Sequence, residues 1–271
     1  EKVWLKSYPP GVPAEIDTHQ YRSLAHLLEE SFTKFAARNA YVCMDRFLTY
    51  GQLDDYSQKL GAWLQSCGME KAARVAVMMP NVLQYPIAAA AILRAGYTVV
   101  NVNPLYTPRE LQHQLSDAGA EAIIILENFA ATLEQVLAKT QVRHIVVASM
   151  GEMLGASKGM VVNFVVRRVK KLVPAFSLPN AVTFKQTLSQ GARLPFKKVE
   201  LKHDDVAFLQ YTGGTTGVSK GATLTHRNII ANVLQNDAWI QPAQKKVADV
   251  QSMTIVCALP LYHIFALTAC A

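Results

Sequence analysis

The stretch RVAVMMPNVLQYPIAAAAILRAGYTVVNV, residues 74–102, decides the fold of this chain. Residues 74–79 form a short apolar run that is typical of a buried strand, and residues 97–102 form a second one. Between them, residues 82–95 have the length and composition of a helix, which Gly96 ends. A strand, a helix and a strand in this order predict two parallel strands joined by a right-handed crossover.

The same alternation of strand and helix extends on both sides of this stretch. The capping box Thr107-Pro108-Arg109-Glu110 predicts a helix that begins there and runs to about Ala118. We therefore predict an α/β fold of doubly wound, mostly parallel sheets flanked by helices. The other expected elements are a helix at 23–37, a strand pair at 41–48, a helix from Thr49 to Gly68, strands at 122–126 and 144–148, and a helix at 130–139.

The regular alternation breaks after residue 150, and this break divides the chain into two predicted subdomains. Residues 1–195 would form a first α/β subdomain, with a basic connecting excursion at about 151–194. Residues 196–271 would begin a second, incomplete α/β subdomain. Its expected elements are strands at 206–211, 222–224 and 253–259 and a helix from His226.

The composition is that of a globular protein with anionic partners. Of the 271 residues, 51% are hydrophobic and 17% are charged, which argues against disorder. The net charge of +7 favours nucleotides, CoA-like phosphates or acidic lipid headgroups as partners. Because no nucleic-acid recognition motif is present, we expect no nucleic-acid partner.

The cysteines and histidines do not have the spacing of a metal site. Cys43, Cys67, Cys257 and Cys270 lie far apart in the sequence, and no two histidines are four residues apart on a helix. We therefore predict no protein metal site, and reduced thiols in a cytoplasmic protein. The chain begins without a signal peptide and has no apolar run of about 18 residues, so no membrane span is expected.

A glycine- and threonine-rich loop, YTGGTTGVSKG at residues 211–221, has the composition of a polyphosphate-binding site. Its glycines allow close backbone approach, successive N–H groups can form an anion nest, and Lys220 adds a positive charge. Ser219 precedes the lysine and Gly221 follows it, so the loop is not a Walker A motif. On composition alone, a flexible surface hairpin is the alternative interpretation.

The order of residues in this loop resembles the signature of the adenylate-forming superfamily, which contains acyl-CoA synthetases, luciferases and peptide synthetase adenylation domains. The flanking sequences Thr225-His226-Arg227-Asn228 and LPLYHIF, residues 259–265, resemble the next motifs of that superfamily. The sequence NVNPLYTPREL, residues 101–111, resembles fatty acid–CoA ligases in particular, as do residues 78–81 and 91–96. The resemblance covers nearly the whole chain and is closest to the amino-terminal part of bacterial long-chain fatty acid–CoA ligases.

The resemblance implies ATP-dependent activation of a long-chain fatty acid through an acyl-adenylate, followed by transfer to CoA. It implies ATP, Mg²⁺ and CoA as cofactor or co-substrates, and it makes Lys220 and His263 the candidate catalytic residues. The implied nucleotide-binding residues are Thr212, Gly213, Gly214, Thr215, Thr216, Gly217 and Lys220. The implied acyl-pocket residues are Tyr262, His263, Phe265 and Leu267.

Several motifs of the superfamily are absent from this sequence. These are a tyrosine-glycine-x-threonine-glutamate motif that helps to bind magnesium, a ribose-binding aspartate and a late adenylation lysine. We therefore expect the chain to be an amino-terminal fragment that does not catalyse adenylation alone.

Residues 160–173 predict a basic amphipathic helix. Valines gather on one face, and the other carries Arg167, Arg168, Lys170 and Lys171, which suits peripheral contact with an anionic membrane on the inner face of the cell membrane. The alternative is an ordinary surface helix that packs on the sheet and leaves its charges in solvent.

Three other functions remain open at this point. The chain could activate another carboxylate, as an aryl-CoA ligase or a fatty acyl-AMP ligase does. It could also be a non-catalytic nucleotide or lipid binding module, or an adaptor at a membrane surface.

Overall fold

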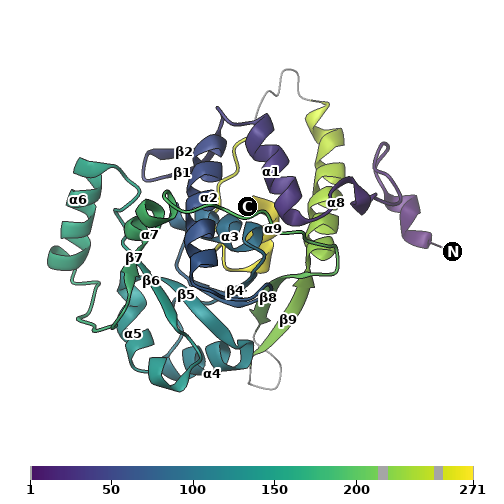
Figure 1. Ribbon diagram of the computed structural model, residues 1–271. Helices are drawn as coiled ribbons and strands as arrows, with labels where there is room; N and C mark the ends of the chain where they lie inside the picture. Colours follow the sequence, from purple (N-terminus) through teal and green to yellow (C-terminus); the bar gives the residue numbers. More distant parts are fainter. Residues whose placement is uncertain (1, 213–218, 247–252, 271) are drawn as a thin grey trace.

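The computed structural model describes residues 2–212, 219–246 and 253–270, and a seven-stranded sheet forms its centre (Figure 1). The strand order is β7-β6-β5-β3-β4-β8-β9; β9 runs antiparallel to β8, and all other neighbours are parallel. The prediction of a mostly parallel sheet is confirmed. The strands are β3 (Arg74–Met78), β4 (Thr98–Asn101), β5 (Ala120–Leu126), β6 (His144–Ala148), β7 (Val182–Thr183), β8 (Val206–Thr212) and β9 (Lys220–Thr225).

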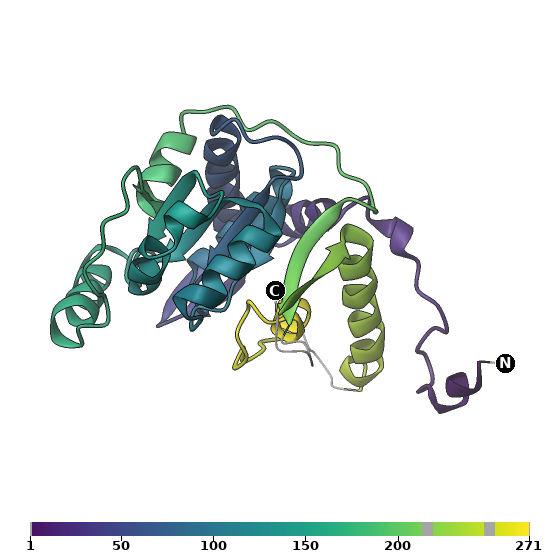
Figure 2. The same cartoon turned by 90° about the horizontal axis from the view of Figure 1, so that it is seen from below.

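Helices cover both faces of this sheet (Figure 2). On one face, α3 lies against the strands, α1 and α2 pack against α3, and α7 packs against α2 and β6; on the other face lie α4 and α5. The helices are α1 (Leu24–Lys34), α2 (Tyr50–Ser66), α3 (Gln84–Arg94), α4 (Pro108–Ala118), α5 (Ala130–Glu134), α6 (Ala156–Phe164), α7 (Phe184–Gly191), α8 (His226–Gln244) and α9 (Ile264–Cys270).

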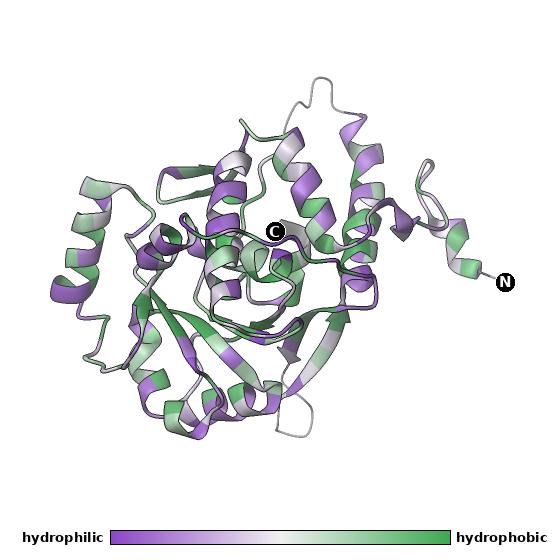
Figure 3. Ribbon diagram, viewed as in Figure 1, coloured by the Kyte–Doolittle hydropathy of each residue, from purple (hydrophilic) through white to green (hydrophobic). Residues whose placement is uncertain are grey.

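The central strand β3 shows why the residues of 74–79 are apolar throughout. Val75 and Val77 belong to the core on the α3 side, whereas Ala76 and Met78 belong to the core on the α4 side. A strand with helices on both faces has no solvated side, so polar alternation is absent. Figure 3 shows the hydrophobic residues concentrated along the central strands.

The strand order reverses at β3. The chain passes from β3 to β4 on one side and then returns to β5 on the other, which makes the sheet doubly wound, as predicted. In such sheets, ligands bind in the crevice outside the carboxyl ends of the strands at the point of reversal. The residues that follow β3, β4 and β8 are therefore the ones that can form a site.

The predicted strand pair at 41–48 is a hairpin of β1 (Asn39–Cys43) and β2 (Arg46–Thr49). Met44 and Asp45 form its turn, and both have positive φ, as a tight hairpin turn with right-handed strand twist requires. The hairpin leads directly into α2, where Thr49 and Gln52 form a reciprocal capping box.

Three predicted elements differ in the structure. The predicted strand at 253–259 is wrong, because residues 253–258 have no regular structure, and no described strand pairs with them. The predicted helix at 130–139 is interrupted after α5 and resumes as a short 3₁₀ turn, Leu137–Lys139. Helix α6 begins before residue 160 and continues only into a π-helical turn, Val165–Val169, because Lys171 adopts a positive φ.

The predicted excursion at 151–194 contains a further unit of the sheet. Strand β7 pairs with β6 in parallel, and α7 follows it and packs against α2. Strands β8 and β9, which were assigned to the second subdomain, extend this same sheet from the other side. The division of the chain at residue 195 stays a prediction.

Candidate functional site

The two ends of the glycine-rich loop are held by the β8–β9 pair. Thr212 lies opposite Lys220, and Tyr211 lies opposite Gly221; the predicted nucleotide-binding residues Gly213, Gly214, Thr215, Thr216 and Gly217 lie outside the described residues. The absence of a side chain at Gly221 is required here, because a Cβ would lie 2.9 Å from two atoms of the Tyr211 ring. Thr212 and Lys220 are both exposed at the base of the loop.

Helix α4 supports the base of the loop from one side. The Tyr211 hydroxyl donates to the carboxylate of Asp117, and the Nε2 atom of His113 lies 3.2 Å from the carbonyl oxygen of Ser219. Burial and the neighbouring Asp117 carboxylate raise the pKa of Tyr211, so the phenol stays protonated as a donor. The segment at 101–111 that resembles fatty acid–CoA ligases therefore leads into the helix that holds the loop.

His263, the second candidate catalytic residue, is exposed and directly precedes α9. Its N–H donates to the Pro260 carbonyl at 2.9 Å, and its Nδ1 atom accepts the N–H of Phe265 at 3.4 Å. An Nδ1 atom that accepts a hydrogen bond places the proton of the neutral ring on Nε2. The ring can therefore present an Nε2–H donor to a carboxylate or a phosphate.

The four predicted acyl-pocket residues differ in their exposure. Tyr262 is half-buried and Phe265 is 61% exposed, but Leu267 is only 6% exposed and belongs to the core beside α3. Phe265 and Leu267 are two residues apart on a helix, so they cannot face the same side. The structure brings Tyr262 and His263 to the carboxyl edge of the sheet and places Leu267 inside.

A buried network of hydrogen-bonded polar side chains, which the sequence did not reveal, lies along this edge. Tyr85 Oη lies 2.7 Å from Asn101 Oδ1, Asn101 Nδ2 donates to Gln210 Oε1 at 3.0 Å, and Gln210 Nε2 donates to the Tyr262 carbonyl at 2.9 Å. Burial raises the pKa of Tyr85, so its hydroxyl remains a donor. This network of side chains joins β8, which leads into the loop, to the segment that contains His263.

One signal could have found this chain of side chains in the sequence. Asn101 directly follows two buried valines at the end of its strand, and Gln210 follows an apolar run in another strand. Carboxyl ends of parallel strands meet at one edge of a sheet, so polar residues at these positions are candidates for a shared network. A buried amide in such a strand needs a partner, which the neighbouring strand supplies.

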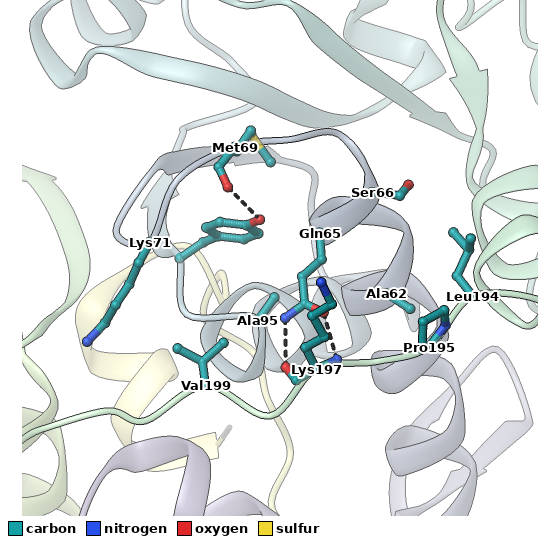
Figure 4. A pocket seen from close by; sticks show the side chains of 11 residues that line it. Ala62, Gln65, Ser66, Met69, Lys71, Ala95, Leu194, Pro195, Lys197 and Val199 are labelled. Atoms are coloured by element: carbon teal, nitrogen blue, oxygen red, sulfur yellow. Dashed lines mark hydrogen bonds between the residues drawn. The ribbon is translucent and has the colours of Figure 1, made fainter.

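The cavity shown in Figure 4 lies elsewhere. It measures about 380 Å³ and is bounded by α2, the turn before β4 and residues 194–199. Lys71 and Lys197 lie at its rim, and Tyr97 donates to the Met69 carbonyl at 3.3 Å inside it. None of the predicted nucleotide or acyl residues that the structure describes lines this cavity.

The flanking motif Thr225-His226-Arg227-Asn228 begins α8. Thr225 and Asn228 form a reciprocal capping box, and the Nδ1 atom of His226 accepts the N–H of Leu24 at 3.1 Å. Burial lowers the pKa of His226 to about 4, with Lys71 and His203 adding to this effect and Asp205 opposing it. His226 is thus a neutral residue of the core that joins α8 to α1.

We expect His226 to make the protein less stable in acid. The unfolded chain takes up this proton near pH 6.5, whereas the folded chain takes it up only near pH 4. Stability is therefore full above pH 6.5 and falls as the pH drops towards 4. We expect the free energy of unfolding, measured by urea titration, to fall by about 3 kcal/mol over this window.

His226→Gln is the control, because the glutamine can accept the same hydrogen bond but does not titrate in this window. We expect the variant to lose less stability than the wild type between pH 6.5 and pH 4. Equal losses in the two proteins would contradict the assignment of His226 as the titrating group.

Within residues 2–212, 219–246 and 253–270, no three side chains of His, Cys, Asp or Glu are grouped as metal ligands. In the same residues, no helix has both the length and the apolar composition needed to cross a membrane.

Comparisons with known proteins identify relatives over nearly the whole chain. The profile of the family described as AMP-binding enzyme matches residues 28–271. A long-chain-fatty-acid--CoA ligase of Yersinia pestis is 53% identical over 269 residues, which cover 99% of this chain and 47% of that protein. The ligase of the same name from Bacillus subtilis is 33% identical over 271 residues, which again cover 99% of this chain and 47% of that protein.

Solved structures share the fold. A long-chain-fatty-acid-CoA ligase from Archaeoglobus fulgidus superposes with a TM-score of 0.67 at 24% identity, covering 94% of this chain and 45% of that one. The chain spans about half the length of the curated relatives that it matches. Because the family profile extends over most of the sequence, the chain belongs to the AMP-binding enzyme family.

Proposed function

We propose that the gene product that carries this chain activates long-chain fatty acids with ATP and transfers them to CoA. The observation that carries the proposal is the 53% identity over 269 residues to a long-chain-fatty-acid--CoA ligase. This identity extends through the loop and the His263 segment. In the first step, a carboxylate oxygen attacks the α-phosphorus of ATP and the bond to pyrophosphate breaks. In the second step, the CoA thiol displaces AMP from the acyl-adenylate.

The loop would stabilise the charge on the departing pyrophosphate. Lys220 stands exposed at its base and can reach a phosphate oxygen, while backbone N–H groups of a glycine-rich loop can bind the others. His263, with its Nε2–H free to donate, would orient the carboxylate or the adenylate phosphate. Tyr262 and Phe265 would contact the acyl chain nearby.

Magnesium would enter this site with the nucleotide. The described residues contain no group of three potential ligands, so the fit to a protein-held ion is poor. Mg²⁺ is commonly held by substrate phosphates and only one or two carboxylates, which is compatible with such a site. We therefore assign no described residue as a magnesium ligand.

The acyl substrate can be tested by competition. We expect the complete gene product to form the CoA thioester of palmitate from ATP and CoA, and to prefer palmitate over 4-coumarate and benzoate. A 4-coumarate--CoA ligase of Solanum tuberosum is also related to this chain, at 23% identity. A preference for an aromatic acid would contradict the proposed fatty acid substrate, but it would leave the proposed two-step reaction intact.

We further propose that a surface formed by α6 and the β1–β2 hairpin contacts anionic membranes. The two elements touch, because Lys158 of α6 bonds to the carbonyl of Met44 and lies 3.1 Å from the Asp45 carboxylate. Helix α6 protrudes from one side of the molecule (Figures 1 and 2). Exposed apolar side chains on this surface, each at least 46% exposed, are Val42, Met44, Phe47, Met160, Val161, Phe164 and Val169.

The four basic residues predicted at this surface are not equivalent. Arg167 donates from both Nε and Nη to the Glu127 carboxylate, with the shorter bond 2.7 Å, and Glu127 is 5% exposed. This ion pair holds the π-helical turn against the end of β5. Arg168, Lys170 and Lys171 are exposed and would meet the lipid headgroups.

We expect the triple variant Arg168→Glu, Lys170→Glu and Lys171→Glu to lose binding to vesicles that contain anionic lipid. Each basic residue near such a surface contributes about 1 kcal/mol, so the loss should be roughly 100-fold or more in a vesicle sedimentation assay. The control carries the same charge change at Lys202, Lys245 and Lys246, which are exposed away from α6. Equal binding by the two triple variants would contradict the proposed surface.

A further inference from the structure

Asn81 follows β3 at the point where the strand order of the sheet reverses. It is the second residue after Met79, the last of the apolar run, and it precedes α3. The residues across from it belong to 257–261, which arrive from a distant part of the sequence. Asn81 therefore stands between the carboxyl edge of the sheet and the segment that leads to His263.

The side chain of Asn81 uses both ends of its amide on this segment. Its Nδ2 atom donates to the Leu259 carbonyl at 2.9 Å and to the Cys257 carbonyl at 3.1 Å, and it lies 3.5 Å from the Cys257 sulfur. Its Oδ1 atom accepts the N–H of Leu261 at 2.7 Å. A single side chain thus binds three residues of the segment.

These side-chain hydrogen bonds hold residues 257–261 in place of the backbone hydrogen bonds that pairing with a strand would have supplied. Residues 253–258 have no regular structure, so their backbone groups have no strand partner among the described residues. Asparagine is suited to this task because it carries a donor and an acceptor on a short, planar group. Aspartate keeps the shape but has no donor, and alanine has neither.

Tyr85 holds the same segment from α3. Its hydroxyl lies 2.9 Å from the Leu261 carbonyl, whose own N–H donates to Asn81. Leu261 is 4% exposed, and both polar groups of its backbone are therefore fixed. His263 lies two residues after Leu261, and its backbone N–H donates a hydrogen bond to the Pro260 carbonyl.

We propose that Asn81 is a positioning residue for His263. It acts by holding residues 257–261 against the carboxyl end of β3. The inference rests on the proposed function, because it gives His263 its role at the reacting carboxylate or adenylate. Asn81 does not need to touch a substrate for this role. Its effect is to set where the imidazole stands relative to the β8–β9 loop.

The test uses Asn81→Ala and Asn81→Asp in the complete gene product, with Asn128→Ala as the matched control. Asn128 also follows a strand of this sheet, but its Nδ2 atom donates to the Leu172 carbonyl, at 3.0 Å, on a different segment. We expect kcat/KM for the fatty acid to fall roughly 100-fold in both Asn81 variants, as small displacements at a reacting centre can do. KM for ATP should stay nearly unchanged, and Asn128→Ala should behave as the wild type.

A second readout does not depend on activity. Alkylation of Cys257 by iodoacetamide, followed by peptide mass spectrometry, reports directly on the clamped segment. We expect its rate to rise several-fold in both Asn81 variants, because the segment opens more often once the clamp is removed. Cys67, whose thiol donates to the Trp63 carbonyl in α2, is the internal reference and should not change.

Two results would overturn the inference. An unchanged alkylation rate at Cys257 in both Asn81 variants would show that Asn81 does not hold the segment. A faster rate with wild-type kcat/KM would show that the clamp exists but does not position His263. A wild-type gene product that forms no acyl-CoA would overturn the proposed function itself, and the alkylation result would still decide whether the clamp exists.

Discussion

Replacing Lys220 by alanine will slow the formation of acyl-adenylate by roughly 100-fold, the usual cost of losing one electrostatic contact to a transition state. Lys220 is the first residue of β9, and its pairing with Thr212 fixes its backbone at the base of the loop. None of the ion pairs between described residues includes Lys220, so its ammonium group is available to a phosphate. The charge on pyrophosphate develops as its bond breaks, which makes the effect mainly one on kcat.

Two controls make this prediction specific. Lys220→Arg keeps the positive charge but changes its geometry, and we expect a partial loss. Lys245→Ala removes an exposed lysine beyond the loop, and we expect wild-type activity. The measurement is the rate of pyrophosphate release with saturating palmitate and ATP. If Lys220→Ala had the kcat of the wild type, Lys220 would have no role in the reaction.

Arg94→Ala will cost about 1–3 kcal/mol of stability, because it removes a buried guanidinium and the hydrogen bond that it donates to the buried Ser57 hydroxyl. The Arg94 side chain is 6% exposed; its Nη1 atom lies 2.8 Å from the Asp54 carboxylate and 2.6 Å from the Ser57 hydroxyl. The Glu29 carboxylate lies 3.5 Å from its Nε atom. The guanidinium also stands over the rings of Phe32 and Phe196, at 5.4 and 5.5 Å from their centroids.

This cluster joins α3 to α1, α2 and the segment before β8. Without the guanidinium, the buried Ser57 hydroxyl loses a donor, whereas Asp54 is partly exposed to water and Glu29 keeps its ion pair with Lys198. Arg94→Lys should lose less, and Arg193→Ala, which changes an exposed arginine, should stay within about 0.5 kcal/mol of the wild type. Urea unfolding measures all three; a loss below about 1 kcal/mol for Arg94→Ala would mean that the cluster contributes little.

Much of the fold followed from local patterns in the sequence. Strand β3 was predictable because its side chains enter two cores, which leaves an apolar run with no polar alternation. The start of α4 was predictable because Thr107 and Glu110 satisfy each other's backbone groups, a contact between near neighbours. Both signals depend only on residues within a few positions of each other.

The errors concern contacts between distant residues. Residues 253–259 have the composition of a strand, but a strand forms only beside a partner, and the segment is bound instead by Asn81, 176 positions before Cys257. The placement of Arg167 at a membrane surface stays a prediction, but its ion pair with Glu127 was missed because periodicity cannot show which distant residue faces a side chain. The chain from Tyr85 to Tyr262 likewise depends on the strand order, which brings β4 next to β8.

The candidate site was predictable in part. The loop at 211–221 stood out by its composition and order, and the structure places its ends on adjacent antiparallel strands. The acyl-pocket residues were grouped by closeness in sequence, which does not separate Phe265, on the outside of α9, from Leu267, in the core. Residue roles at both places stay predictions.

We propose that the gene product that carries this chain forms an acyl-adenylate from a fatty acid and ATP. The most direct measurement is the exchange of radiolabelled pyrophosphate into ATP by the complete gene product, with palmitate present and CoA absent. We expect exchange that requires palmitate and does not require CoA, because adenylate formation is reversible and precedes thioester formation. No palmitate-dependent exchange, or cleavage of ATP to ADP and phosphate, would contradict it.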